Sequence, residues 1–246
     1  MRLHRLPSNI AIALTIALST AACARPSGTG AASSAAPVAA STTPHAASTT
    51  VPVPGGCSAP RTTPPDAVGC YHAATRHIGV VSATPLYWHL DRYPTRAAAE
   101  SARGERGAVA EAHGRVWLFT IAEADWRPAG GERVARVGPL PLVAGRDYTA
   151  YWIEGVVPPG ARTPAHMHAG PEAWYVVEGT NCLQTPTDTR TASAGESLII
   201  PEGPAMILTG VGQTTRRSLA LVVHDASKPW TIPVETFTPA KGCPRE

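Results

Sequence analysis

The segment from Gly160 to Gly179, GARTPAHMHAGPEAWYVVEG, limits the fold of this chain more than any other part of the sequence. His166 and His168 stand two residues apart in an extended run, so the two-residue period of a strand places both imidazoles on one face. Ala-Gly-Pro at 169–171 supplies turn chemistry, and Glu172 opens a return strand. We therefore predict a tight hairpin that brings together two imidazoles and a carboxylate, which are ligands that divalent metal ions accept.

The return strand adds the walls of a pocket to this cluster. Alternation places Trp174 and Val176 on the same face as Glu172, so an aromatic and an aliphatic side chain flank the carboxylate. Small-molecule pockets are lined mainly by such apolar groups around a few polar ones. The sequence therefore predicts a ligand pocket on this face of the strand.

The spacing of this segment resembles the first signature of the cupin superfamily. The five fixed positions of that signature are matched by Gly160, His166, His168, Glu172 and Gly179. The resemblance implies that His166, His168 and Glu172 are ligands of a bound metal ion.

A second cupin-like signature follows, with its metal-binding position substituted. Gly195, Pro201 and Gly203 match its glycines and proline, whereas Met206 stands where metal-binding cupins usually carry a histidine, and Gly210 where an asparagine is expected. A thioether suits Cu(I) better than Fe(II), Mn or Zn, but unbranched Met is also a common filler of apolar gaps. Because Met206 lies in the apolar run PAMIL, we expect it to pack in the pocket wall rather than to bind copper.

The resemblance extends from Tyr148 to Asp225 and implies an all-β cupin fold, a double-stranded β-helix or jelly-roll barrel. After Gly145 the sequence consists of short apolar runs separated by Gly, Pro, Asn and Asp, the pattern expected of such a barrel. With 43% apolar residues the folded part can support one sizeable core. We assign the barrel to residues 143–235 and a C-terminal tail to residues 236–246.

Residues 57–142 precede the barrel and are predicted to form a small α+β extension packed on it. Thr95 is a suitable N-cap for the short helix RAAAESAR, which Gly104 would end. The dipeptide His113-Gly114 separates two apolar runs and predicts a hairpin. We expect the strands of this region to extend the sheet of the barrel, because a separate core of this size would be marginal; an independent subdomain is the alternative.

Residues 1–23 have the features of an export signal, with two arginines followed by an apolar run, Ile10 to Leu18, that is too short to span a bilayer as a helix. Cys23 follows Thr-Ala-Ala and resembles the lipidated cysteine of a bacterial lipobox. This pattern predicts a periplasmic or membrane-anchored lipoprotein of the bacterial cell envelope; cleavage after Ala24 and free secretion is the alternative. Residues 24–56, rich in Ala, Ser, Thr and Pro, are predicted to be a disordered linker.

Four further cysteines, Cys57, Cys70, Cys182 and Cys243, remain for the folded part. An even number in an exported chain indicates disulfides formed in an oxidising compartment, and the absence of a C-x-x-C pair argues against a metal role. Four cysteines allow three connectivities. We expect Cys57 to pair with Cys243, because both lie in proline-rich flanks, and Cys70 to pair with Cys182.

The ligand set of His166, His168 and Glu172 would accept Fe, Mn, Zn, Ni or Cu, so the ligands alone name no reaction. We predict a cell-envelope cupin that binds a divalent metal ion and takes a small-molecule ligand in its pocket. A metal-dependent enzyme such as an Fe(II) dioxygenase is one alternative, and a metal-free ligand-binding or structural cupin is another. The sequence does not decide whether the chain is an enzyme.

The charge pattern bears on partners. The formal net charge is +3 without a long basic run, which gives no indication of nucleic-acid binding. Membrane contact is expected only through a lipid anchor at Cys23. A homo-oligomer remains an open alternative for the assembly.

Overall fold

The computed structural model describes residues 56–244, and within them the chain forms one helix and fourteen strands. The N-terminal elements are β1 (Gly69–Val80), β2 (Tyr87–Tyr93), α1 (Arg96–Ala102), β3 (Gly107–Ala112), β4 (Arg115–Ala122) and β5 (Glu132–Val137). The later elements are β6 (Asp147–Val157), β7 (His166–Met167), β8 (Glu172–Glu178), β9 (Thr180–Gln184), β10 (Thr189–Ser193), β11 (Ser197–Ile200), β12 (Ile207–Val211), β13 (Arg216–Asp225) and β14 (Ile232–Pro233).

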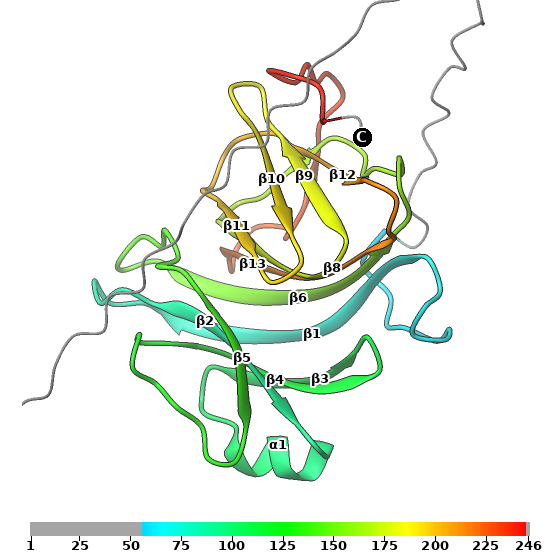
Figure 1. Cartoon of the computed structure of the whole chain (residues 1–246). Helices are drawn as coiled ribbons and strands as arrows, with labels where there is room; N and C mark the ends of the chain where they lie inside the picture. Colours follow the sequence, from blue (N-terminus) through cyan, green and yellow to red (C-terminus); the bar gives the residue numbers. More distant parts are fainter. Residues whose placement is uncertain (1–55, 245–246) are drawn as a thin grey trace, which may run out of the picture. The chain divides into compact units, whose positions relative to one another are not determined.

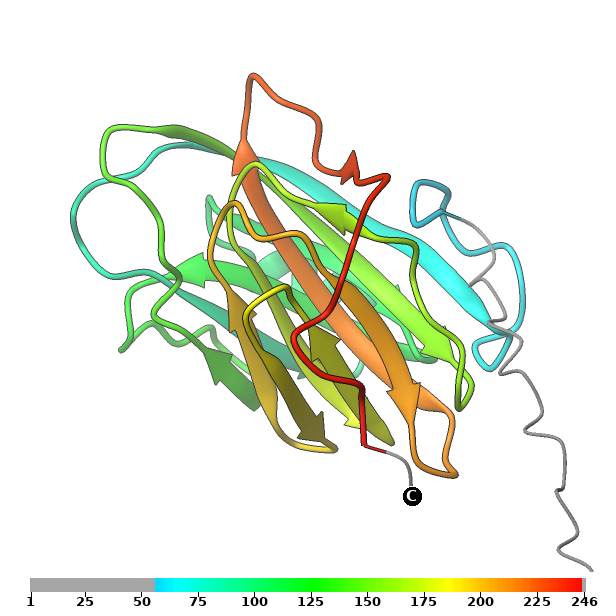
Figure 2. The ribbon, with the colours of Figure 1, turned by 90° about the horizontal axis from the view of Figure 1, so that it is seen from above.

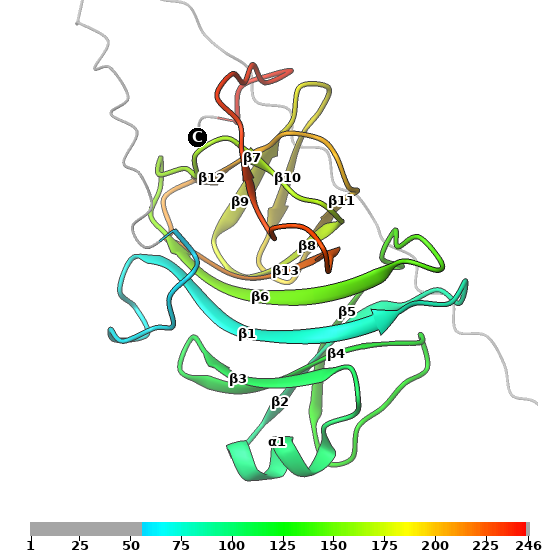
Figure 3. The same ribbon diagram turned by 180° about the vertical axis from the view of Figure 1, so that it is seen from behind.

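Two antiparallel sheets form a jelly-roll barrel, so the predicted all-β fold is confirmed. One sheet has the strand order β1-β6-β13-β8-β11, and the other has the order β10-β9-β12. Figure 1 shows the smaller sheet, in yellow and orange, lying over β6, β13 and β8. The short strands β7 and β14 pair with each other at the side of the barrel, which Figure 3 shows from behind.

The five-stranded sheet is buried on both faces because its central strands carry apolar side chains on alternate sides. β6 and β13 run side by side along their whole length, as Figure 2 shows. One face of this sheet contributes Trp152 and Leu219 to an outer core, and the other contributes Ile153 and Ala220 to a core inside the barrel. The sheet therefore separates two apolar cores.

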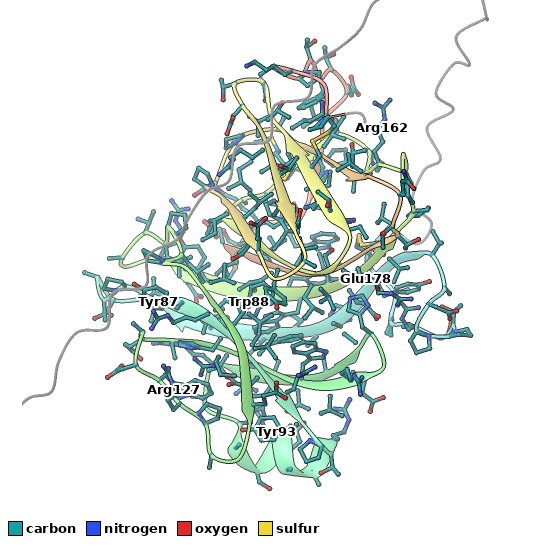
Figure 4. The ribbon with its side chains drawn as sticks, viewed as in Figure 1. Tyr87, Trp88, Tyr93, Arg127, Arg162 and Glu178 are labelled. Atoms are coloured by element: carbon teal, nitrogen blue, oxygen red, sulfur yellow. A yellow bond between two sulfur atoms is a disulfide. The ribbon has the colours of Figure 1, made fainter. Side chains whose placement is uncertain are left out.

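A four-stranded sheet, in the order β3-β4-β2-β5, covers the outer face of the five-stranded sheet. Figure 4 shows side chains filling the space between these layers, among them Trp88, which is fully buried. Helix α1 packs on the far side of the four-stranded sheet, below it in Figure 1. The predicted N-cap is confirmed, because the hydroxyl of Thr95 accepts a hydrogen bond from the backbone N–H of Ala98 at 3.2 Å.

The region before the barrel differs in part from the sequence prediction. The hairpin at His113-Gly114 is confirmed, and both of its turn residues have positive φ angles, as a two-residue hairpin turn requires. Only β1 joins the sheet of the barrel, however, and the expectation that the other strands would also extend it is wrong. β2 to β5 form their own sheet. Because the apolar face of this sheet is buried against the barrel, the region does not need a separate core.

The disulfide pairing predicted from the sequence is also wrong. The structure joins Cys57 to Cys70 and Cys182 to Cys243, with Cα atoms 4.5 and 6.0 Å apart. Cys57 lies on the loop that leads into β1, and Cys70 is the second residue of that strand. The C-terminal segment crosses β9, because the carbonyl of Lys241 accepts a hydrogen bond from the amide of Gln184, and this crossing brings Cys243 to Cys182. The two bridges indicate an oxidising, extracytoplasmic environment.

The predicted signal segment, Cys23 and nearly all of the predicted linker at 24–56 lie outside the described residues. Within residues 56–244, no helix is long and apolar enough to cross a membrane.

Candidate metal centre

His166, His168 and Glu172 come together inside the barrel, although not through the predicted hairpin. Strand β7 pairs with β14, and His166 also forms an isolated bridge with Met206. Strand β8, which Glu172 opens, pairs instead with β11 and β13. The cluster is thus supplied by β7 with His168, the residue that follows it, and by β8, which does not pair with β7. Residues 169–171 carry the chain from one part of the barrel to the other.

The turn between His168 and Glu172 is held tightly against β13. The backbone carbonyls of Ala169 and Pro171 accept hydrogen bonds from the N–H groups of Asp225 and Val223, at 2.8 and 2.9 Å. A Cβ atom at Gly170 would lie 1.9 Å from the carbonyl oxygen of Val223, closer than any real contact. This position therefore needs glycine because the two backbones approach closely. The two hydrogen bonds to β13 fix the separation of the segments that carry the cluster.

One ligand-type atom from each of the three residues lies within 4.8 Å of the other two. The imidazole rings of His166 and His168 have centroids 5.0 Å apart, so both face the same region, as the alternation predicts. Nε2 of His168 lies 2.9 Å from Oε2 of Glu172. Ligands of one ion with bonds of about 2.0–2.2 Å are about 3–4 Å apart, so the group needs to close by no more than about 2 Å to hold an ion.

Hydrogen bonds to the backbone set the tautomer of both histidines. Nδ1–H of His166 donates to the carbonyl of Pro164 at 2.8 Å, and Nδ1–H of His168 donates to the carbonyl of Trp230 at 2.5 Å. In the neutral form of each imidazole, Nε2 then carries a lone pair. Histidines that bind metals usually donate their other ring N–H in this way, which fixes the ring and strengthens the ligand.

The lone pairs facing one another have no hydrogen-bond partner. Within the described part of the chain, Nε2 of His168 and Oε2 of Glu172 are buried and unpartnered, because their short separation lacks hydrogen-bond geometry. Buried polar atoms are rarely left in this state unless an ion or water fills the site. The donor set and its burial therefore fit a divalent cation.

The two imidazoles differ in their electrostatics. Burial lowers the pKa of His166, and the nearby Glu172 carboxylate only partly opposes this effect. Burial also acts to lower the pKa of His168, but the charge and contact of Glu172 outweigh it, so the pKa of His168 is raised. The carboxylate thus interacts more strongly with His168 than with His166.

The cluster opens into a cavity of about 230 Å³ inside the barrel. Of the side chains predicted for the pocket wall, Trp174 lines the cavity. The prediction that Met206 and Val176 line the pocket needs correction. Both are buried in the apolar cluster of the barrel and are not among the lining residues. Met206 is thus packed as a filler of the core, in agreement with the apolar run around it.

Arg216 and Trp230 also line this cavity, and the sequence analysis did not predict a role for either. The ring of Trp230 stacks on Tyr151, with centroids 4.5 Å apart, and lies beside His168. The sequence could have indicated Arg216, because the two-residue period of β13 places it on the same inward face as Ser218 and Ala220. The placement of Trp230 follows from a loop that carries no periodic pattern.

One family model matches part of the barrel. Residues 154–206 match the family model described as a cupin domain, which supports the cupin superfamily for the barrel. No curated protein matches the chain. A cupin-like protein of Thermotoga maritima is 19% identical, with 35% of this chain and 64% of that chain covered and a TM-score of 0.31.

Two other solved structures show a similar level of likeness. An oxalate oxidase in complex with the substrate analogue glycolate is 19% identical, with 35% of this chain and 46% of that chain covered and a TM-score of 0.29. A double-stranded β-helix protein of Klebsiella pneumoniae is 17% identical, with 39% and 82% covered and a TM-score of 0.32. This chain covers less than two thirds of the cupin-like protein and of the oxalate oxidase, whose activity is a property of that enzyme.

Proposed function

We propose that the barrel binds a divalent metal ion through Nε2 of His166, Nε2 of His168 and a carboxylate oxygen of Glu172, and presents it to a small molecule in the cavity. The observation that carries this proposal is the pair of Nδ1–H bonds to backbone carbonyls, which leaves both Nε2 atoms free to bind an ion beside one buried carboxylate. Three protein ligands leave coordination positions open for water or a ligand.

The ligand set suits Fe, Mn, Zn, Ni or Cu, and affinity follows the Irving–Williams order rather than function. When bound, such an ion would supply Lewis-acid chemistry or, for iron, the open positions found in facial-triad Fe(II) oxygenases. The protein's own groups orient the imidazoles and, through Trp174 and Trp230, present an apolar wall beside them. A metal-dependent enzyme such as an Fe(II) dioxygenase is the more specific form of this proposal.

Elemental analysis of the exported protein, purified without added metal, tests the proposal directly. We expect about one metal ion per chain in the wild type, and none in His166→Ala or His168→Ala. His77→Ala is the matched control, because His77 is exposed and lies outside the cavity. A wild-type protein that carries no metal, and takes none up on reconstitution, would refute the metal site and favour a metal-free ligand-binding or structural cupin.

Met206→His gives a second test, because the backbones of Met206 and His166 exchange two hydrogen bonds, at 2.8 and 3.1 Å. Residues in such a pair have their side chains on the same face, so a histidine at 206 would project beside His166. We expect the metal affinity to rise by at least about tenfold, which corresponds to about 1.4 kcal/mol. An unchanged affinity would show that the fourth position is not part of the site.

We also propose that the mature chain is a lipoprotein of the cell envelope, tethered through Cys23 and the segment at 24–56. The export-like N-terminus and the two disulfides support this location. Cys23→Ser should release the protein from the membrane fraction without changing the fold of the barrel. An equally soluble wild type would instead favour free secretion.

A further inference from the structure

Arg216 places a guanidinium inside the barrel. It is the first residue of β13, and its inward parity is shared with Ser218 and Ala220, both of which also line the cavity. Only 4% of Arg216 is exposed. Its neighbour Arg217 points to the other side of the sheet, where it pairs with Glu178. The strand thus carries one arginine into the cavity and the next one away from it.

The guanidinium of Arg216 lacks a carboxylate partner. Two other largely buried arginines have one: Nε of Arg61 lies 2.8 Å from Glu154, and Nε of Arg133 lies 2.7 Å from Asp91. Across residues 56–244, no carboxylate lies within ion-pair distance of Arg216. Its one hydrogen bond runs from Nη1 to the side-chain oxygen of Asn181 at 2.9 Å, and its Nε is buried without a partner.

The charge nevertheless persists at neutral pH. Burial lowers the pKa of Arg216 to about 10, and the Glu172 carboxylate partly offsets that effect. A buried cation without a counter-charge is costly, and the cost is relieved when an anion enters. A guanidinium offers two parallel N–H groups along its Nε edge, a geometry that matches a carboxylate.

Gly155 and Ser218 line the cavity together with Arg216. A Cβ atom at Gly155 on β6 would lie 3.6 Å from Nη2 of Arg216 and 3.2 Å from the hydroxyl of Ser218. Gly155 is not among the glycines with positive φ, so its backbone does not itself require glycine. The contact with the Ser218 hydroxyl would be tighter than most real Cβ contacts, so a side chain at this position would press on Ser218 and lie against Arg216.

The remainder of the cavity is mainly apolar. Its walls include Ile153, Val157, Trp174, Leu208 and Trp230. Glu172 pairs with Val222, six residues along β13 from Arg216, so the two side chains come from different positions along the sheet. The guanidinium and the His-His-Glu cluster therefore enter the same cavity from separate positions. Its volume, about 230 Å³, suits a small ligand rather than a drug-sized one.

We propose that the cavity binds a small organic acid with an apolar body, whose carboxylate is held by Nε and Nη2 of Arg216 with help from the hydroxyl of Ser218. The apolar body packs against Trp174 and Trp230, and its other end faces His166, His168 and Glu172. This inference rests on the proposed function in that it assigns a substrate class to the same cavity, but its support is the unpaired guanidinium.

Isothermal titration calorimetry with a panel of monocarboxylates, from butanoate to 3-phenylpropanoate, tests the inference when each acid is paired with its neutral amide. We expect at least one acid to bind at least about tenfold more tightly than its amide, because the amide cannot neutralise the guanidinium. Arg216→Met should remove that preference. Arg216→Lys should retain part of it, because an ammonium keeps the charge but loses the planar fork.

Arg217→Met is the matched control, since it removes the same charge from the adjacent position on the opposite face. It should bind the acids as the wild type does, and far-UV circular dichroism should show all variants folded. The inference is overturned if no acid is preferred over its amide, or if Arg216→Met binds the acids like the wild type.

The metal proposal and the carboxylate proposal can be tested independently. His166→Ala, which should lose the metal, should still prefer acid over amide through Arg216, although more weakly because a nearby cation is gone. If the wild type binds metal but Arg216→Met leaves acid binding unchanged, the metal proposal stands and the carboxylate site is wrong. If the acids bind in an Arg216-dependent manner to a protein that takes up no metal, the reverse holds.

Discussion

The two faces of β13 (Arg216–Asp225) differ in polarity where the strand begins. Its outward residues Leu219, Leu221 and Val223 are apolar, at most 1% exposed, and packed under the four-stranded sheet. Its inward residues at the start of the strand, Arg216 and Ser218, are equally sheltered from solvent but polar. One strand thus contributes a dry core on one side and the lining of a ligand cavity on the other.

The surroundings of the two faces differ in the same way. On the outer side Phe119 stacks between Trp117 and Trp152, with ring centroids about 6 Å away on each side. On the inner side lie the cavity and the unpartnered atoms of His168, Glu172 and Arg216. We infer that the outer core supplies much of the stability that allows costly polar groups to remain inside the barrel.

Gly170→Ala should give the largest effect, because it disturbs the backbone clamp between the inner cluster and β13. The added methyl group would overlap the carbonyl of Val223, and the turn would have to move. We expect a loss of unfolding free energy of more than about 4 kcal/mol, measured by urea denaturation, together with loss of metal. Gly104→Ala is the control, since the nearest atom to its new Cβ is 3.9 Å away. A stable, metal-binding Gly170→Ala protein would show that side chains rather than the backbone position the cluster.

Leu219→Ala tests the outer face alone. Leu219 is fully buried between the sheets, so its truncation leaves a cavity in a close-packed region. We expect urea denaturation to show a loss of about 2–5 kcal/mol, with metal content and ligand affinity unchanged in the folded fraction. A reduced metal content at full folding would mean that the two faces are coupled rather than separate.

Sequence patterns predicted the parts of the site that depend on local geometry. The two-residue period placed His166 and His168 on one face and Trp174 with Glu172, and both placements are correct. The same period could not tell which strands pair, because pairing is decided by non-local contacts. The hairpin expected around Gly170 was therefore wrong, and the close approach that actually requires this glycine involves a strand more than fifty residues later.

Other features were missed for the same reason. The bridge between Cys182 and Cys243 depends on how the C-terminal segment crosses β9, which no local pattern encodes. Whether the strands before the barrel extend its sheet or form another depends on which apolar faces match. Arg216 combines both situations. The alternation along the strand could have indicated which face carries its side chain, but its lack of a carboxylate partner is visible only in the folded chain.

Acid should weaken the outer layer through His89. This histidine is buried on β2, donates from Nε2 to the carbonyl of Glu123 at 2.8 Å, and has a pKa lowered to about 4 by burial and by Arg133. The folded state holds it neutral, so its contribution is complete above about pH 6.5 and is lost as the pH falls toward 4. We expect a loss of about 3 kcal/mol over that range, seen as the difference between wild type and His89→Gln in denaturation at each pH.

His77→Gln provides the matched control for this pH series, because His77 is largely exposed. On acidification it should lose stability much more nearly as the wild type does than as His89→Gln does. If His89→Gln lost stability on acidification as steeply as the wild type, the acid sensitivity would belong to another group, and the outer layer would not be the part that acid weakens first.

The smallest expected effect has the opposite sign and comes from the inner face. Removing the charge in Arg216→Met relieves the desolvation of an unpaired guanidinium, which often stabilises a protein by about 1–4 kcal/mol when the replacement is apolar and of similar volume. The variant also deprives Asn181 of its donor, which costs about 1–3 kcal/mol. We therefore expect a net gain of about 1 kcal/mol in urea denaturation of the ligand-free protein, with Arg217→Met unchanged. A clear loss of stability would mean that Arg216 holds the barrel together, and the contrast between a stabilising outer face and a ligand-binding inner face would then not apply at the start of β13.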